Sequence, residues 1–162
     1  MIVAEPTGLL QSAYTLTDPD GAGGPFGEVA LRLFRGGRLT VGDVDYELEP
    51  ADWTKTSLAL VRDGRRVALA SRPQLWRRRY QVDVRADAVG LDGDLVLDFA
   101  VEGWLGRAWT LTADGLDAGR ADWRGGWKPR LDADFSEAVP LVVQAFLVAV
   151  AVVERRRSRR NH

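Results

Sequence analysis

The sequence predicts a mainly β protein, in which a closed antiparallel β-barrel surrounds a hydrophobic C-terminal helix. Residues 9–131 are expected to form roughly ten to twelve short strands, with turns about every 8–12 residues, as in antiparallel sandwiches and barrels. Residues 139–153 form an almost unbroken apolar run. A helix that is apolar on all faces must be buried on all sides. In a β protein, the lumen of a closed barrel is the place that surrounds one helix completely.

The expected strands alternate apolar and polar residues, or form short apolar runs that end at Gly and Asp. In chain order they cover residues 12–17, 28–34, 38–41, 44–49, 57–62, 65–71, 79–85, 88–91, 94–101, 108–112 and 118–123. Asp-Gly dipeptides at 63–64, 92–93 and 114–115 each separate two expected strands. Asp-Gly favours the type I′ turn, in which both central residues need a positive φ. We therefore expect a tight hairpin at each of these positions.

The apolar run predicts a helix over about residues 140–156, followed by a basic tail over 155–162. Pro140 suits a first helical turn, and the arginines suit a C-terminal end. Two alternatives remain, a short membrane tail anchor and a buried strand. Residues 141–153 would span only about 20 Å as a helix, whereas the hydrocarbon core of a bilayer is ~30 Å thick. The central helix is therefore the favoured interpretation.

Length and composition indicate one globular domain over residues 1–162. The formal net charge is -1, so nucleic acid is an unlikely partner. Cysteine is absent, which fits a reducing compartment, and the N-terminal residues do not resemble a secretory signal. We expect a cytoplasmic protein, either free or bound at the periphery of a membrane. The strong preference for Arg over Lys is typical of a GC-rich bacterial genome.

Three stretches carry a resemblance to a known family: YTLTDPDG at 14–21, LVRDGRRVALASRPQLWRRRYQV at 60–82, and VPLVVQAFLVAVAVVERRR at 139–157. In these stretches and their order, the chain resembles the tubby C-terminal-like superfamily. That group includes tubby proteins, phospholipid scramblases, plant LURP-one-related proteins and short bacterial proteins. The resemblance implies a twelve-stranded barrel closed around a C-terminal helix. Tubby proteins bind phosphoinositides and scramblases act on membrane lipids, but none of their functional residues can be placed here one by one.

The sequence offers no convincing catalytic constellation. Its only histidine is His162, the last residue, and it contains neither a P-loop nor a strand-linked GxGxxG. Asp92, Asp94 and Asp98 superficially suggest a calcium loop, but the other ligands of an EF-hand are missing. We expect these acids to be solvated around a hairpin turn. The chain is therefore predicted to be a non-enzymatic protein with no cofactor and no metal.

Basic residues beside aromatic ones are the most informative candidates for a binding site. They are Trp76, Arg77, Arg78 and Arg79, then Lys128 and Arg130 beside Trp123 and Trp127, and finally Arg155, Arg156 and Arg157. An indole beside guanidinium groups suits the anionic headgroups of a membrane surface. The alternative is that these arginines are solvated or paired with acids. We expect Trp123 and Trp127 to pack in the barrel wall.

The leading functional hypothesis is a membrane-peripheral or protein-interaction module whose basic clusters bind an anionic membrane surface or an acidic protein. A small-molecule-binding or enzymatic barrel is an alternative, and it predicts a roomy lumen. A tail-anchored membrane protein is a further alternative, and it predicts that the protein pellets with membranes and needs detergent.

Overall fold

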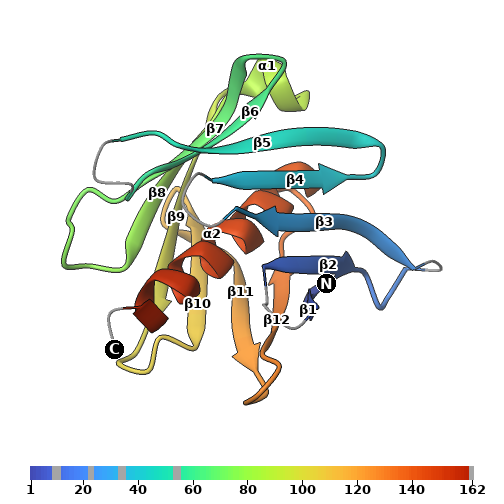
Figure 1. Ribbon diagram of the computed structural model, residues 1–162. Coiled ribbons are helices and arrows are strands. Elements are labelled where there is room, and N and C mark those ends of the chain that lie inside the picture. The colour runs from blue at the N-terminus through green and yellow to red at the C-terminus, as the bar shows by residue number, and fades with distance from the viewer. Residues whose placement is uncertain (9–11, 22–23, 33–35, 53–55, 161–162) are drawn as a thin grey trace.

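The computed structural model describes residues 1–162 except 9–11, 22–23, 33–35, 53–55 and 161–162. The side chain of Arg160 is also outside the described part. Its strands pair antiparallel in chain order, and β1 pairs with β12, so that the barrel is closed (Figure 1). The strands are β1 (Ile2–Thr7), β2 (Ala13–Thr17), β3 (Pro25–Leu31), β4 (Gly37–Val41), β5 (Val44–Pro50), β6 (Leu58–Arg62), β7 (Arg65–Ser71), β8 (Arg79–Val84), β9 (Leu95–Glu102), β10 (Ala108–Ala113), β11 (Leu116–Arg124) and β12 (Arg130–Phe135).

Helix α2 (Leu141–Arg160) fills the lumen of the barrel, as the sequence predicts. Side chains on every face of its apolar part are buried, and they belong to one core cluster with the inward residues of the strands. The strands supply alternate residues to this cluster, such as Tyr80, Val82 and Val84 of β8. The polar Gln144 is accommodated because its amide donates hydrogen bonds to the carbonyls of Ser136 and Val139, the latter at 2.8 Å.

Helix α2 differs from the prediction at its C-terminal end, because it continues to Arg160 rather than ending near Arg156. The expected basic tail over 155–162 is thus helical through Arg160, and residues 161–162 lie outside the described residues. Arg155, Arg156 and Arg157 are partly buried. The physical reason is that these long side chains still find packing partners at the mouth of the barrel, so the helix remains supported there.

The strands occupy a wider range than the predicted 9–131. β1 begins at Ile2 and β12 ends at Phe135. β1 closes the barrel, because it pairs with both β2 and β12. Pro6 and Glu5 obscure the strand pattern in β1. Pro6 is tolerated there although it cannot donate a ladder hydrogen bond. The expected start at residue 9 lies outside the described residues.

Two of the three expected Asp-Gly hairpins are confirmed. Asp63 and Asp114 have φ values of 50° and 51°, and each is followed by a glycine with positive φ, as a type I′ turn requires. The expected hairpin at 92–93 is wrong, and so is the strand over 88–91. Helix α1 (Ala86–Val89) covers the first half of that stretch, and residues 90–91 follow the helix without forming a strand. Asp94 explains the difference, because its carboxylate accepts a hydrogen bond from the Ala86 amide at 2.8 Å. Of the acids Asp92, Asp94 and Asp98, Asp94 therefore has a structural role in this turn.

The two ends of the barrel have different chemistry. Because consecutive strands are antiparallel neighbours, the loops alternate between the ends. We call one end the arginine end; it carries the loops 72–78, 103–107 and 125–129 and the last turns of α2. We call the other the hairpin end, which carries α1 and the two Asp-Gly hairpins. In Figure 1 the dark red end of α2 lies beside the yellow loop between β9 and β10, at the arginine end.

Candidate functional site

The tryptophan rim is the most unusual surface feature of the arginine end. Trp76, Trp104 and Trp127 are 81%, 94% and 90% exposed, and each lies on a different loop of that end. Leu75 and Leu105, next to two of these tryptophans, are also exposed. We define these five residues as the tryptophan rim. These side chains expose large apolar groups on three separate loops at one end of the barrel, which makes that end a candidate interaction surface.

A buried carboxylate links the helix to the wall of the barrel beneath this rim. Glu154 of α2 is 5% exposed, and its Oε2 accepts a hydrogen bond from the Tyr80 hydroxyl at 2.7 Å. Arg72 Nη1 lies 3.5 Å from Oε2, and Arg78 Nε lies 3.6 Å from Oε1. Burial and the Glu154 charge raise the pKa of the Tyr80 phenol, which keeps its proton available for this hydrogen bond. These contacts fix the orientation of α2 at the arginine end.

Arg72 also organises the loop that carries Trp76. Its guanidinium donates hydrogen bonds to the carbonyls of Leu75 and Arg77, and it lies 5.8 Å from the centre of the Tyr80 ring. The loop 72–78 is therefore held from below by a side chain that is itself bound to Glu154. An exposed tryptophan on a loop with such support is presented in a defined place.

A second acid, Asp52, binds Thr56 and Ser57 just before β6. Asp52 accepts hydrogen bonds from the amides and hydroxyls of Thr56 and Ser57, at distances of 2.7–3.2 Å. Burial alone would raise its pKa, but these hydrogen bonds outweigh burial and lower the pKa to about 2. Arg157 Nη1 lies 3.4 Å from the Thr56 carbonyl oxygen, so that α2 contacts the same segment as well.

Near the end of α2, Arg155 packs over the aromatic ring of Trp123. The Arg155 guanidinium lies 4.5 Å from the centre of the Trp123 ring, in a cation–π arrangement. Burial lowers the pKa of Arg155, and the nearby charge of Arg159 lowers it further. Within the described residues, Arg155 Nε and Arg156 Nη1 are buried and have no hydrogen-bond partner. In the described part of the chain, no carboxylate forms an ion pair with Arg155, Arg156 or Arg157, so these three residues bring positive charge to the end of the helix.

A mouth pocket of about 780 Å³ opens between the end of α2 and the barrel wall. Its floor and sides include Trp109 and Trp123, which are buried, whereas Trp104 and Leu105 of the rim lie at its edge. Its charged lining residues are Arg78, Arg107, Glu154, Arg155 and Arg159. The arrangement is a basic pocket with an apolar rim, and it suits an anionic group on an apolar carrier.

The structure divides the sequence-predicted site residues into two groups. Trp76, Arg77, Arg78, Lys128, Arg155, Arg156 and Arg157 lie at the arginine end. Arg79 and Arg130 are paired with acids. The Arg79 guanidinium donates two hydrogen bonds to Asp98, and Arg130 Nε lies 3.1 Å from Oδ1 of Asp132, whose other carboxylate oxygen lies 2.9 Å from Arg124 Nε. These two belong to ion pairs on the wall.

Trp123 and Trp127 were expected to share one role, but they differ. Trp123 packs in the barrel wall as predicted, with its ring edge-on to Tyr14. The same expectation is wrong for Trp127, which lies in the loop 125–129 and is 90% exposed. The difference follows from position, since Trp123 points inward from β11 whereas Trp127 comes after the strand has ended.

Sequence reasoning missed several residues of this site, including Trp104, Leu105, Arg72, Arg107 and Glu154. Trp104 and Leu105 stand between Gly103 and Gly106 in a loop joining two strands, where apolar residues are unusual. Two large apolar residues in such a loop could have indicated that Trp104 and Leu105 belong to a binding surface. Glu154 carried a weaker signal as the acid that ends a long apolar run.

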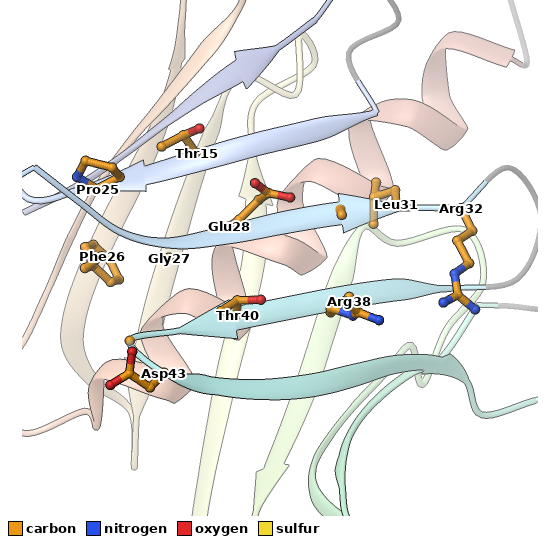
Figure 2. Close-up of a pocket in the computed structure, with 12 residues that line it drawn as sticks. Thr15, Pro25, Phe26, Gly27, Glu28, Leu31, Arg32, Arg38, Thr40 and Asp43 are labelled. Carbon is orange, nitrogen blue, oxygen red and sulfur yellow. The ribbon is translucent and has the colours of Figure 1, made fainter.

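A second, shallower pocket of about 640 Å³ lies on the outer wall over β2, β3 and β4 (Figure 2). Thr15, Glu28 and Thr40 occupy adjacent positions on these three strands. None of the unpartnered buried polar atoms found in the described residues lines this pocket. It is therefore a weaker candidate than the mouth pocket.

Within the described part of the chain, no helix has the length and apolar character to cross a membrane. The same residues contain no group of His, Cys, Asp and Glu side chains suited to a metal ion. No family model, curated protein or solved structure matches this chain. The site must therefore be interpreted from its own chemistry.

Proposed function

We propose that this protein is a non-enzymatic, membrane-peripheral module that docks on anionic lipid surfaces through its arginine end. The observation that carries this proposal is the location of the tryptophan rim. Trp76, Trp104 and Trp127 surround the same end of the barrel at which the arginines of α2 gather. Tryptophan prefers the interface between water and hydrocarbon, and arginine binds phosphate oxygens. The two residue types together match the layered chemistry of a lipid surface.

The charges on this end make the interaction selective for anionic lipids. Arg77 and Lys128 are exposed beside the rim, and Arg155, Arg156 and Arg157 are partly exposed. A basic residue near an anionic leaflet contributes about 1 kcal/mol. Three to five such residues together with the rim are enough for reversible binding in the micromolar range. The near-neutral net charge of the whole chain does not oppose this, because the cations are local.

Membership of the tubby C-terminal-like superfamily belongs to the same proposal. The closed barrel around α2 is the architecture that the resemblance implies. Relatives in that group act on or bind membrane lipids, which supports a lipid-facing role. A small-molecule-binding barrel would need a roomy lumen, and α2 occupies that space here.

Vesicle co-sedimentation of the full chain tests the proposal. We expect at least about tenfold tighter binding to vesicles that contain phosphatidylglycerol than to neutral phosphatidylcholine vesicles, with the difference shrinking at high salt. Equal binding to both vesicles, or binding to neither, would contradict a role at anionic membranes. Salt-sensitive binding to polyglutamate without binding to vesicles would instead favour the acidic-protein partner.

A further inference from the structure

We propose that the mouth pocket is a specific site for a phosphate monoester group. The inference goes beyond surface docking, because it assigns a defined ligand group to a defined cavity. It rests on unpartnered donors and on charge within the pocket, and so it stands without the proposed membrane docking. Only the identification of a lipid as the source of the phosphate rests on that proposed function.

The first observation is a set of hydrogen-bond donors without acceptors. Trp109 and Trp123 are 1% and 6% exposed, and their indole Nε1 atoms have no hydrogen-bond partner within the described residues. Arg155 Nε is unpartnered as well. All three residues line the mouth pocket. Buried donors in native proteins are normally paired, and an unpaired group calls for a specific explanation. An acceptor-rich ligand provides one.

The second observation is the charge of the lining. Arg78, Arg107, Arg155 and Arg159 contribute guanidinium groups to the pocket, and Glu154 is the acid among its lining residues. The Glu154 carboxylate is already engaged by the Tyr80 hydroxyl and by Arg72 and Arg78. Among the described residues that line the pocket, no carboxylate forms an ion pair with Arg107 or Arg155. The group that fits this environment is an anion.

The choice of phosphate follows from the number and type of donors. A phosphate monoester offers three terminal oxygens and close to two negative charges at neutral pH. Arginine binds such oxygens in bidentate geometry, and an indole N–H supplies a further single bond. A carboxylate has two oxygens in one plane, which leaves fewer acceptors for donors that come from both the helix and the barrel wall. The exposed Trp104 and Leu105 at the edge suit the apolar part of a lipid that carries the phosphate.

Binding at this site should change the surroundings of Trp123. Arg155 lies across the Trp123 ring, and the indole N–H of Trp123 is buried. A phosphate can reach both groups only if the long Arg155 side chain moves. Tryptophan fluorescence is therefore an expected readout of ligand binding, alongside calorimetry.

Two probes distinguish a soluble phosphate from a lipid source. The first is glycerol 3-phosphate, with glycerol as the uncharged control. The second is a pair of vesicles matched in surface charge, one with phosphatidic acid (a monoester) and one with phosphatidylglycerol (a diester). We expect saturable binding of glycerol 3-phosphate near the millimolar range or tighter, or at least about fivefold preference for phosphatidic acid.

Matched variants assign the effect to the pocket. Arg155→Gln should weaken binding of the responding probe by about tenfold, the loss expected for a charged hydrogen bond. Trp123→Phe retains an aromatic ring and removes the donor, and it should weaken binding by a smaller factor. Arg130→Gln removes one charge from the outer wall, where Arg130 pairs with Asp132, and should leave the affinity within about twofold.

The outcomes separate this inference from the proposed function. Binding of glycerol 3-phosphate that Arg155→Gln weakens, without vesicle binding, supports a phosphate site for a soluble ligand and contradicts membrane docking. Anionic vesicle binding with no preference for phosphatidic acid and no response to glycerol 3-phosphate overturns the phosphate site while membrane docking stands. Equal effects of Arg155→Gln and Arg130→Gln would also overturn the site, because the binding would then depend on overall charge.

Discussion

Replacement of Leu147 by alanine is expected to lower the free energy of unfolding by about 3–5 kcal/mol. Leu147 lies in the middle of α2 and is fully buried in the barrel lumen. Leu→Ala substitutions in closely packed cores lose both the transfer free energy of the side chain and the packing around the cavity that remains. In a chain of this length, such a loss lowers the melting temperature by roughly 10 °C. Urea denaturation and a thermal melt both measure it.

The same substitution at Leu141 is the matched control. Leu141 begins α2 and is 49% exposed, so that its replacement by alanine should cost less than about 1 kcal/mol. Equal destabilisation by the two variants would contradict the view that α2 is the core of the barrel. A Leu147→Ala chain that fails to fold, beside a Leu141→Ala chain that folds, agrees with that view.

Replacement of Trp76, Trp104 and Trp127 together by alanine is expected to weaken binding to anionic vesicles by about 100-fold. Each exposed indole should contribute about 1 kcal/mol at the membrane interface, and 1.4 kcal/mol corresponds to a factor of ten. Because these side chains are 81–94% exposed, the variant should keep its fold and nearly all its stability. Co-sedimentation measures the affinity, and circular dichroism checks the fold.

A control for this triple variant lies at the other end of the barrel. Leu116 follows the Asp114–Gly115 turn at the hairpin end and is 73% exposed. Its replacement by alanine removes exposed apolar surface from a face that we do not expect to touch the membrane. Vesicle affinity should remain within about twofold of the wild type. An equal loss from Leu116→Ala and from the rim variant would show that docking is not specific to the arginine end.

Much of the fold is predictable from the sequence, because the strongest patterns are local. Alternating residues in segments such as β8, Asp-Gly turns such as Asp63–Gly64, and the apolar run of α2 each indicate their structure within a few residues. Closure of the barrel is less visible, because β1 pairs with β12 across almost the whole chain. The region around α1 was misread because the structural role of Asp94 depends on a contact with Ala86.

The candidate site is only partly predictable, because it assembles from loops that are distant in the sequence. Trp76, Arg77 and Arg78 stand out in the sequence and lie in the loop 72–78, whereas Arg79 begins β8. Trp104 and Trp127 share an end of the barrel with Trp76 because consecutive strands run in opposite directions, which places every second loop at the same end. The partial burial of Arg155, on α2, depends on Trp123, which comes from β11. Neither relationship has a local signal.

Hydrogen exchange with and without phosphatidylglycerol vesicles tests most directly whether the arginine end is the docking surface. We predict that anionic vesicles slow amide exchange in the loops 72–78, 103–107 and 125–129. Exchange at the hairpin-end turns 63–64 and 114–115 should remain unchanged, because these turns would face water. Protection at the hairpin end, or unchanged exchange in all three rim loops while the protein is bound to vesicles, would contradict the proposed docking surface.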